Sequence, residues 1–167
     1  IDTGQTLSPH RDTWGSNVMT QLNWWAPVYP VTPEKTLLIY PGYWERMVTN
    51  SSEGWDYKTL KNMSDEEKKQ ESNLLPIAAE GIKLDDGMAI VPETGDMYVF
   101  SGAQLHASVP NSTDTIRYSL EARTFDITDE QAGYGAPNID GAPARTAYSW
   151  FYRLSDRAKA KDLITSP

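Results

Sequence analysis

The chain has 167 residues, 39% of them hydrophobic and 23% charged, with no cysteine and a formal net charge of −8. This length suits one domain with its own hydrophobic core, so we expect a single domain over residues 1–167. The lack of cysteine excludes disulfides and thiolate sites, and the negative charge argues against nucleic acid as a partner. No apolar run reaches the length of a membrane span and no secretory pattern opens the chain, so we expect a cytoplasmic protein.

The first half of the chain predicts two strands. Residues 17–28 contain β-forming side chains, and Pro27 and Pro30 close the segment, which favours a strand that ends in a turn. Residues 36–40 (TLLIY) are a short apolar run before Pro41-Gly42, the pattern of a strand that enters a turn. Residues 43–62 are irregular and rich in aromatic side chains.

A short charged helix is predicted next. Ser64 and Glu67 have the spacing of a capping box, so a helix from there to about Ser72 is expected. Its lysines and glutamates suit a solvated face, and we interpret it as a surface insertion.

The second half predicts further short strands. From Ala89 onward, the segments AIVPE, MYVF and QLHASVP are separated by turn residues, and residues 115–125 (TIRYSLEARTF) alternate as a strand does. Residues 133–144 are rich in glycine and proline and predict a loop, and a short helix is expected over residues 155–163.

Short strands separated by turns, with one charged helix, indicate a mainly β fold. We expect a double-stranded β-helix, that is, a jelly roll or cupin-like barrel with a short helical insertion, because this fold brings early and late strands together. The chain begins at Ile1 and places only nine residues before His10, so we expect it to be N-terminally incomplete.

Both histidines of the chain fit one metal-site pattern. His10 and Asp12 are separated by one residue, so in an extended strand their side chains point to the same side. If His106 joins them, two imidazoles and one carboxylate leave open positions on the metal, as in non-haem Fe(II) oxygenases. The alternatives are a metal-free His–Asp hydrogen bond and histidines that only pack or lie at the surface.

Arg117 and Ser119 form a second pair with the same spacing. A guanidinium binds a carboxylate through two charge-assisted hydrogen bonds, so this pair suits the distal carboxylate of a co-substrate such as 2-oxoglutarate. A salt bridge from Arg117 to Glu121 is the alternative, and Arg123 is a rival anchor. Gln21, Asn23 and Trp24, on the strand after the first ligand pair, are further candidates to line the co-substrate pocket, although large aromatic residues more often serve as packing.

Together these segments resemble the phytanoyl-CoA-dioxygenase-like family of Fe(II)/2-oxoglutarate oxygenases. The resemblance lies in His10-Arg11-Asp12, in TLLIYPGYW, and in GDMYVFSGAQLHASVPN followed by TIRYSLEA, over residues 7–125. Family members often have Ser-His after the Pro-Gly, whereas this chain has Tyr43-Trp44. Order and spacing carry this resemblance more than any single motif.

The resemblance implies a double-stranded β-helix dioxygenase that hydroxylates a small organic substrate with O2 while 2-oxoglutarate is decarboxylated to succinate. His10, Asp12 and His106 would hold Fe(II), and Arg117 with Ser119 would bind 2-oxoglutarate. An aspartate in the first motif favours hydroxylation over halogenation. We expect that part of the substrate pocket or one barrel edge lies upstream of residue 1.

Two other hypotheses remain open at this stage. One is a catalytically silent jelly-roll binding module, and the other is a cupin-like metalloenzyme that does not use 2-oxoglutarate. The sequence does not identify the substrate or the oligomeric state, and no basic patch suited to binding coenzyme A stands out in it.

Overall fold

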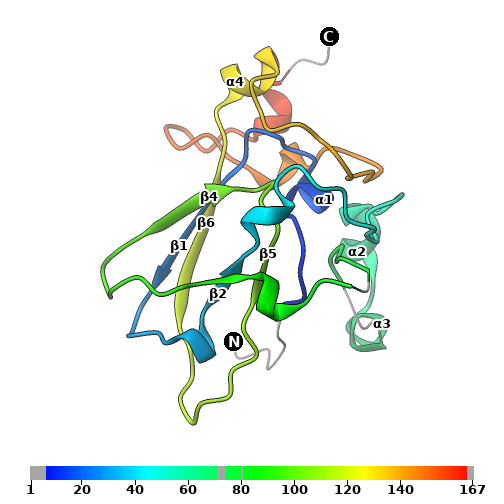
Figure 1. Cartoon of the computed structure of the whole chain (residues 1–167). Helices are drawn as coiled ribbons and strands as arrows, with labels where there is room; N and C mark the ends of the chain where they lie inside the picture. The colour runs from blue at the N-terminus through cyan, green and yellow to red at the C-terminus, as the bar shows by residue number, and fades with distance from the viewer. Residues whose placement is uncertain (1–6, 71–73, 80, 165–167) are drawn as a thin grey trace.

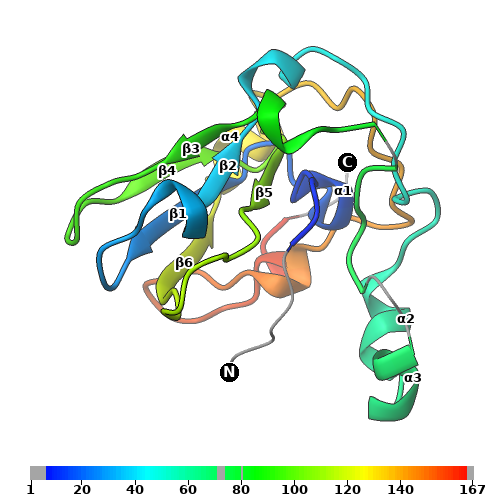
Figure 2. The ribbon, with the colours of Figure 1, turned by 60° about the horizontal axis from the view of Figure 1, so that its bottom comes forward.

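The computed structural model describes residues 7–70, 74–79 and 81–164 of the chain. Within these residues, two antiparallel three-stranded sheets form the centre (Figures 1 and 2). The strands are β1 (Leu22–Pro27), β2 (Leu37–Ile39), β3 (Met88–Ile90), β4 (Tyr98–Ser101), β5 (His106–Ser108) and β6 (Ser119–Thr124). The α-helices are α1 (Thr13–Ser16), α2 (Tyr57–Asn62), α3 (Asp65–Gln70) and α4 (Ile127–Ala132). Helices α1, α2 and α3 lie on one side of the sheets, and α4 lies at one end (Figures 1 and 2).

The first sheet has the order β4-β1-β6. Along β1, Asn23 and Trp25 are buried whereas Leu22 is exposed, as expected for a strand with one covered face. Arg123 of β6 lies opposite Asn23, so its side chain emerges on this covered face.

The second sheet has the order β3-β2-β5. All of β2 is buried because both of its faces are covered. Leu37 and Ile39 pack with Trp25 of the first sheet, and Leu38 packs on the other side with Trp14. The two sheets therefore form two layers, which pack against each other through Trp25, Leu37 and Ile39.

Several predicted elements are confirmed with narrower bounds. β2 lies within residues 36–40, and β6 lies within residues 115–125. The strand predicted from residue 17 begins only at Leu22, because α1 occupies the preceding turn and ends at Asn17 with a left-handed φ of 53°. The local helical turn overrides the β-forming residues there.

The capping box is confirmed. The backbone nitrogen of Ser64 donates to the Glu67 carboxylate at 2.7 Å, and the Glu67 nitrogen donates back to the Ser64 hydroxyl at 3.2 Å. The helix α3 follows directly, and the predicted extension to residue 72 lies outside the described residues.

The helix predicted over residues 155–163 is wrong. Tyr152 pairs with Lys159, and Arg157 has a φ of 61°, so the chain turns back on itself before a single 3-10 turn at Ala160–Asp162. Conversely, α2 and α4 were not predicted, although each begins at an aspartate N-cap, Asp56 and Asp126.

The mainly β class is thus confirmed, but among the described residues no strand pairing joins the two sheets into a closed barrel. The double-stranded β-helix therefore stays a prediction. In the same part of the chain, no helix is long and apolar enough to cross a membrane.

Candidate metal centre

The two histidines are brought together by backbone pairing. The nitrogen of His10 donates to the carbonyl of His106 at 2.9 Å, and the nitrogen of His106 donates to the carbonyl of His10 at 2.9 Å. Residues 7–10 therefore extend the second sheet beyond β5. Both imidazoles are buried, and their ring centroids lie 4.2 Å apart.

Asp12 reaches the histidines from a helical turn. Its own backbone is already helical (φ −62°, ψ −30°), and its carbonyl accepts from the nitrogen of Ser16, the last residue of α1. The expectation that an extended strand aligns His10 with Asp12 is therefore corrected. The side chains still converge, because Asp12 Oδ1 lies 3.4 Å from His10 Nε2 and 3.9 Å from His106 Nε2.

Each imidazole is held in a ligand-ready orientation. His10 Nδ1 lies 2.8 Å from the Ser8 carbonyl, and His106 Nδ1 lies 2.9 Å from the Gln104 carbonyl. Because a carbonyl only accepts, each Nδ1 carries the proton and each Nε2 offers its lone pair toward Asp12. This is the hydrogen bonding that fixes the tautomer of metal-binding histidines. One ligand atom from each of the three residues lies within 4.8 Å of the others.

Two hydrogen bonds from neighbouring side chains orient Asp12. Arg123 Nε donates to Asp12 Oδ2 at 2.5 Å, and Gln21 Nε2 donates to the same oxygen at 3.1 Å. Gln21 is almost fully buried and also donates to Asn23 Oδ1 at 2.8 Å. Oδ2 is therefore engaged by the protein, while Oδ1 faces the two imidazoles.

The protonation states also suit a metal. Burial alone would raise the pKa of Asp12, but its interactions with His10 and with the charge of Arg123 outweigh burial and hold the pKa well below its usual value. Burial, together with the neighbouring His10, lowers the pKa of His106 to about 3. At neutral pH the site thus presents a carboxylate and a neutral imidazole, the forms that bind metals.

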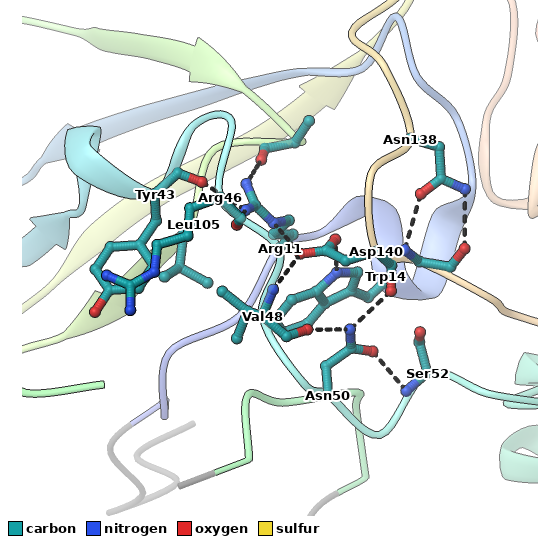
Figure 3. A network of polar contacts seen from close by, with 12 residues as sticks. Arg11, Trp14, Tyr43, Arg46, Val48, Asn50, Ser52, Leu105, Asn138 and Asp140 are labelled. Atoms are coloured by element: carbon teal, nitrogen blue, oxygen red, sulfur yellow. Dashed lines mark hydrogen bonds and ion pairs between the residues drawn. The ribbon is translucent and has the colours of Figure 1, made fainter. Parts of the chain in front are cut away.

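An ion pair on the far side of this segment fixes its position (Figure 3). Arg11 Nε donates to Asp140 at 3.2 Å, and both side chains are almost fully buried. The Arg11 guanidinium also donates to the carbonyls of Tyr43 (2.7 Å) and Ala103. Since Arg11 lies between His10 and Asp12, this network holds the backbone from which both side chains project.

Asp140 itself accepts from three directions in Figure 3. Besides Arg11, the indole of Trp14 donates to it at 2.7 Å and the nitrogen of Val48 donates at 3.1 Å. The segment 133–144, predicted only as a loop, is therefore anchored at Asp140. No motif marks this residue in the sequence, because its partner Arg11 is 129 positions away.

Arg117 lies beside Ser108, at the end of β5 opposite His106. Its guanidinium donates to the Thr36 carbonyl at 3.0 Å and to Ser108 Oγ at 3.3 Å. Ser119, half-buried, lies opposite Pro27 on β1, so Ser108 supplies the hydroxyl that Arg117 contacts among the described residues. Within the same residues Arg117 forms no ion pair, to Glu121 or to any other carboxylate.

Trp24 borders the space between the sheets, but its indole nitrogen donates to Thr124 Oγ1 at 2.8 Å. Thr124 faces away from Arg123 by strand alternation, so the Trp24 ring lies toward the outer face. Asn23 is the β1 side chain that projects inward beside Gln21. The alternation of residues along the two strands indicates this arrangement, because Asn23 and Arg123 both fall on the covered face.

Two hollows meet at the three candidate ligands. The first lies between the sheets beside His10, His106 and Arg123, and its volume of about 30 Å³ is room for water-sized molecules. The second, of about 300 Å³, opens at Asp12 and is mainly apolar. Its other lining residues include Tyr57, Leu75, Pro76 and Trp150. Tyr57 from the aromatic-rich segment 43–62 thus reaches the site.

No known protein family and no curated protein matches this chain. Solved structures similar to it include EvdMO1 (18% identity, TM-score 0.43, covering 72% of this chain and 23% of that one). EvdO2 from Micromonospora carbonacea var. aurantiaca, complexed with 2-oxoglutarate, is 16% identical with a TM-score of 0.48, covering 74% and 48%. SnoN, a non-heme alpha ketoglutarate dependent epimerase from nogalamycin biosynthesis, is 19% identical with a TM-score of 0.43, covering 85% and 52%.

The chain thus spans about half the length, or less, of these similar proteins. All three TM-scores lie below 0.5, so the functional conclusion for this chain is drawn from its own residues. The donor set of two imidazole nitrogens and one carboxylate oxygen fits Fe(II). It leaves coordination positions for other ligands.

Proposed function

We propose that this chain is an Fe(II)- and 2-oxoglutarate-dependent dioxygenase that hydroxylates a small organic molecule. The observation that carries the proposal is the convergence of His10 Nε2, His106 Nε2 and Asp12 Oδ1 in a buried site. Each Nε2 is directed inward by a carbonyl on Nδ1, and Asp12 is held as a carboxylate. A hydrogen-bonded pair without a metal would not need the second imidazole.

In this proposal Arg117 binds the distal carboxylate of 2-oxoglutarate. Only some of its five donors are engaged, by Thr36 and Ser108, and no carboxylate of the described residues pairs with it. Arg123 is the weaker candidate, because its contact with Asp12 places it at the metal end of the site. The distal carboxylate lies several bonds from the keto acid group that would bind the metal, so its anchor must lie farther away.

Iron, when bound with 2-oxoglutarate and O2, would supply the oxidising chemistry. One oxygen atom of O2 enters the substrate C–H bond as a hydroxyl group, and the other enters succinate as CO2 leaves. The protein's own residues have simpler tasks. Arg123 and Gln21 hold Asp12 in place, and the apolar cavity beside Tyr57 and Trp150 excludes water from the substrate.

One observation favours a second candidate, a cupin-like metalloenzyme that uses no 2-oxo acid. The hollow between the sheets is about 30 Å³, smaller than a five-carbon dicarboxylate needs. Binding of 2-oxoglutarate at Arg117 therefore requires the side chains between the sheets to move. The second candidate needs no such movement.

The test is an anaerobic titration of the Fe(II)-loaded protein with 2-oxoglutarate, monitored by the visible metal-to-ligand charge-transfer band. We expect a saturable band in the natural protein and in Asp96→Asn, which alters an exposed carboxylate outside the site. Asp12→Asn should bind iron poorly and show no band. One-to-one iron without a band would instead support the cupin-like enzyme, and failure to bind iron would support a silent binding module.

A further inference from the structure

A large groove continues from the apolar cavity beside Asp12. Its volume is about 650 Å³, and it shares Gly15, Tyr57 and Trp150 with that cavity. Tyr57 and Trp150 meet edge to face with ring centroids 4.8 Å apart. A ligand that lies in the groove can therefore extend past these two rings toward the candidate metal ligands.

Positive charge is concentrated in this groove. Its lining contains five of the chain's 15 basic residues and only one of its 23 acidic residues. The basic residues are Lys58, Lys61, Arg145, Lys159 and Lys161. The chain as a whole has a net charge of −8, so this local excess of basic residues has the opposite sign and creates a positive potential in the groove.

Few of these charges are neutralised by the protein. Asp56, the acidic residue of the lining, is 2.9 Å from Arg145. Lys161 Nζ lies 3.8 Å from Asp162, and both side chains are exposed. Within the described part of the chain, the ammonium groups of Lys58, Lys61 and Lys159 form no ion pair with a carboxylate.

The walls that carry the charges are fixed. One wall is α2, whose first turn is capped by Asp56 at 2.8 Å from the Lys58 nitrogen. The other wall is the segment 145–161, which is joined to the end of α1 by the Ala147–Ser16 hydrogen bond of 2.7 Å. Figures 1 and 2 show this orange-to-red segment beside α1. The sequence shows no basic run because the charges come from separate segments.

We infer that this groove binds the anionic end of the substrate, and that this end carries one or more phosphate groups. Four of the five cations are lysines, which bind phosphate as point charges, and the groove is much larger than a single carboxylate needs. The apolar remainder of the substrate lies between Tyr57, Leu75 and Trp150, with its reacting carbon at Asp12. The identification of the bound molecule as the substrate rests on the proposed function.

The first test is a calorimetric titration of the full chain with inorganic tripolyphosphate at low ionic strength. We expect saturable one-to-one binding that weakens as salt is added. The double variants Lys58→Gln/Lys61→Gln and Lys159→Gln/Lys161→Gln should each weaken binding about tenfold, since each removes two charges near the anion. The matched control is Lys68→Gln/Lys83→Gln, which makes the same change in net charge outside the groove and should bind as the natural protein does.

Equal weakening in the control would show binding by overall charge and would overturn the inference, as would unchanged binding in both groove variants. All variants alter lysines that are not in the core, so matching melting temperatures confirm that they fold. Tripolyphosphate binding requires neither iron nor 2-oxoglutarate. A normal charge-transfer band without selective anion binding would therefore overturn only the inference that the groove binds an anion. Selective anion binding by a protein that does not bind iron would overturn the proposed enzyme, and with it the assignment of the anion as part of its substrate.

Discussion

Arg123 Nε donates to Asp12 Oδ2 at 2.5 Å, and this contact joins strand β6 to the turn that begins α1. The carboxylate is almost buried, whereas the arginine side chain is 42% exposed. Arg123 therefore acts as a partner for Asp12 at the rim of the site. It neutralises the carboxylate and turns its other oxygen toward the histidines.

Replacing Arg123 should make the metal-free protein less stable at neutral pH. In Arg123→Gln, Asp12 loses a cation that lowers its pKa, so its buried charge is less well compensated. Because solvent screens a side chain this exposed, we expect a loss of only about 1 kcal/mol in the free energy of unfolding. The loss should be present above pH 4 and should shrink as the pH falls and Asp12 becomes protonated.

Urea unfolding with a chelator present, at several pH values, measures this effect. Arg153→Gln is the matched control, because it removes an arginine whose exposed ion pair is with Asp156 and not with Asp12. If Arg123→Gln were as stable as the control at pH 7, the Arg123–Asp12 contact would be of no energetic consequence.

Arg117 should determine the preference for a co-substrate with a distal carboxylate. We expect Arg117→Ala to bind iron normally but to bind 2-oxoglutarate about 10- to 100-fold more weakly, because a charge-assisted contact to a carboxylate is lost. The sharper comparison uses 2-oxobutyrate, which has the same keto acid end and no distal carboxylate. Natural protein should prefer 2-oxoglutarate, and Arg117→Ala should lose this preference.

Charge-transfer titrations with both keto acids provide the measurement. Equal weakening of both ligands would point to a general defect of the site. A preserved preference for 2-oxoglutarate would exclude Arg117 as the anchor. It would favour Arg123, which lines the hollow between the sheets.

The sequence predicted the features of this site that depend on residue type and, along residues 115–125, on strand alternation. With two histidines in the chain, the pair His10 and His106 was the natural metal candidate, and the structure pairs their backbones directly. Alternation along residues 115–125 likewise placed Arg117 on the face opposite to Ile116 and Tyr118, which are exposed.

The features that the sequence did not predict depend on contacts between distant segments. The covered face of β6 was predictable, but the contact of Arg123 with Asp12 required the antiparallel pairing of β6 with β1. The burial of Arg11 against Asp140 likewise depends on how the segment 133–144 returns to α1. Local propensity also failed at residues 17–21, where a turn after Asp12 delays β1.

His106 should make the metal-free protein sensitive to acid. Its pKa is lowered from about 6.5 in the unfolded chain to about 3 in the fold, so the unfolded state binds a proton more readily. Stability should therefore fall as the pH decreases below 6.5, by about 3 kcal/mol between pH 6.5 and pH 4 from this residue. Asp12 adds a further loss below pH 4, because its pKa is also lowered.

The experiment compares urea unfolding of natural protein and His106→Gln between pH 8 and pH 4 with a chelator present. The variant should be less dependent on pH over the interval from 6.5 to 4, even if it is less stable throughout. A variant with the same slope as natural protein would show that other groups cause the acid sensitivity.

Asp140 should be essential for the position of the candidate ligands. It accepts hydrogen bonds from Arg11, Trp14 and Val48, and an asparagine has only one oxygen to accept them while its NH2 group faces donors. Asp140→Asn also leaves the buried Arg11 without a counter-charge. We expect a loss of about 3 kcal/mol or more in the free energy of unfolding, because breaking a buried ion pair costs this much.

The same variant should weaken iron binding although Asp140 contacts none of the three candidate ligands, since Arg11 fixes the backbone between His10 and Asp12. Asp156→Asn is the control, because its ion pair with Arg153 is exposed and should contribute little. Unfolding at 25 °C and Fe(II) titration at a temperature where both variants are folded separate the two effects. Unchanged iron affinity in folded Asp140→Asn would mean that the strand pairing of His10 with His106 alone is enough to position the site.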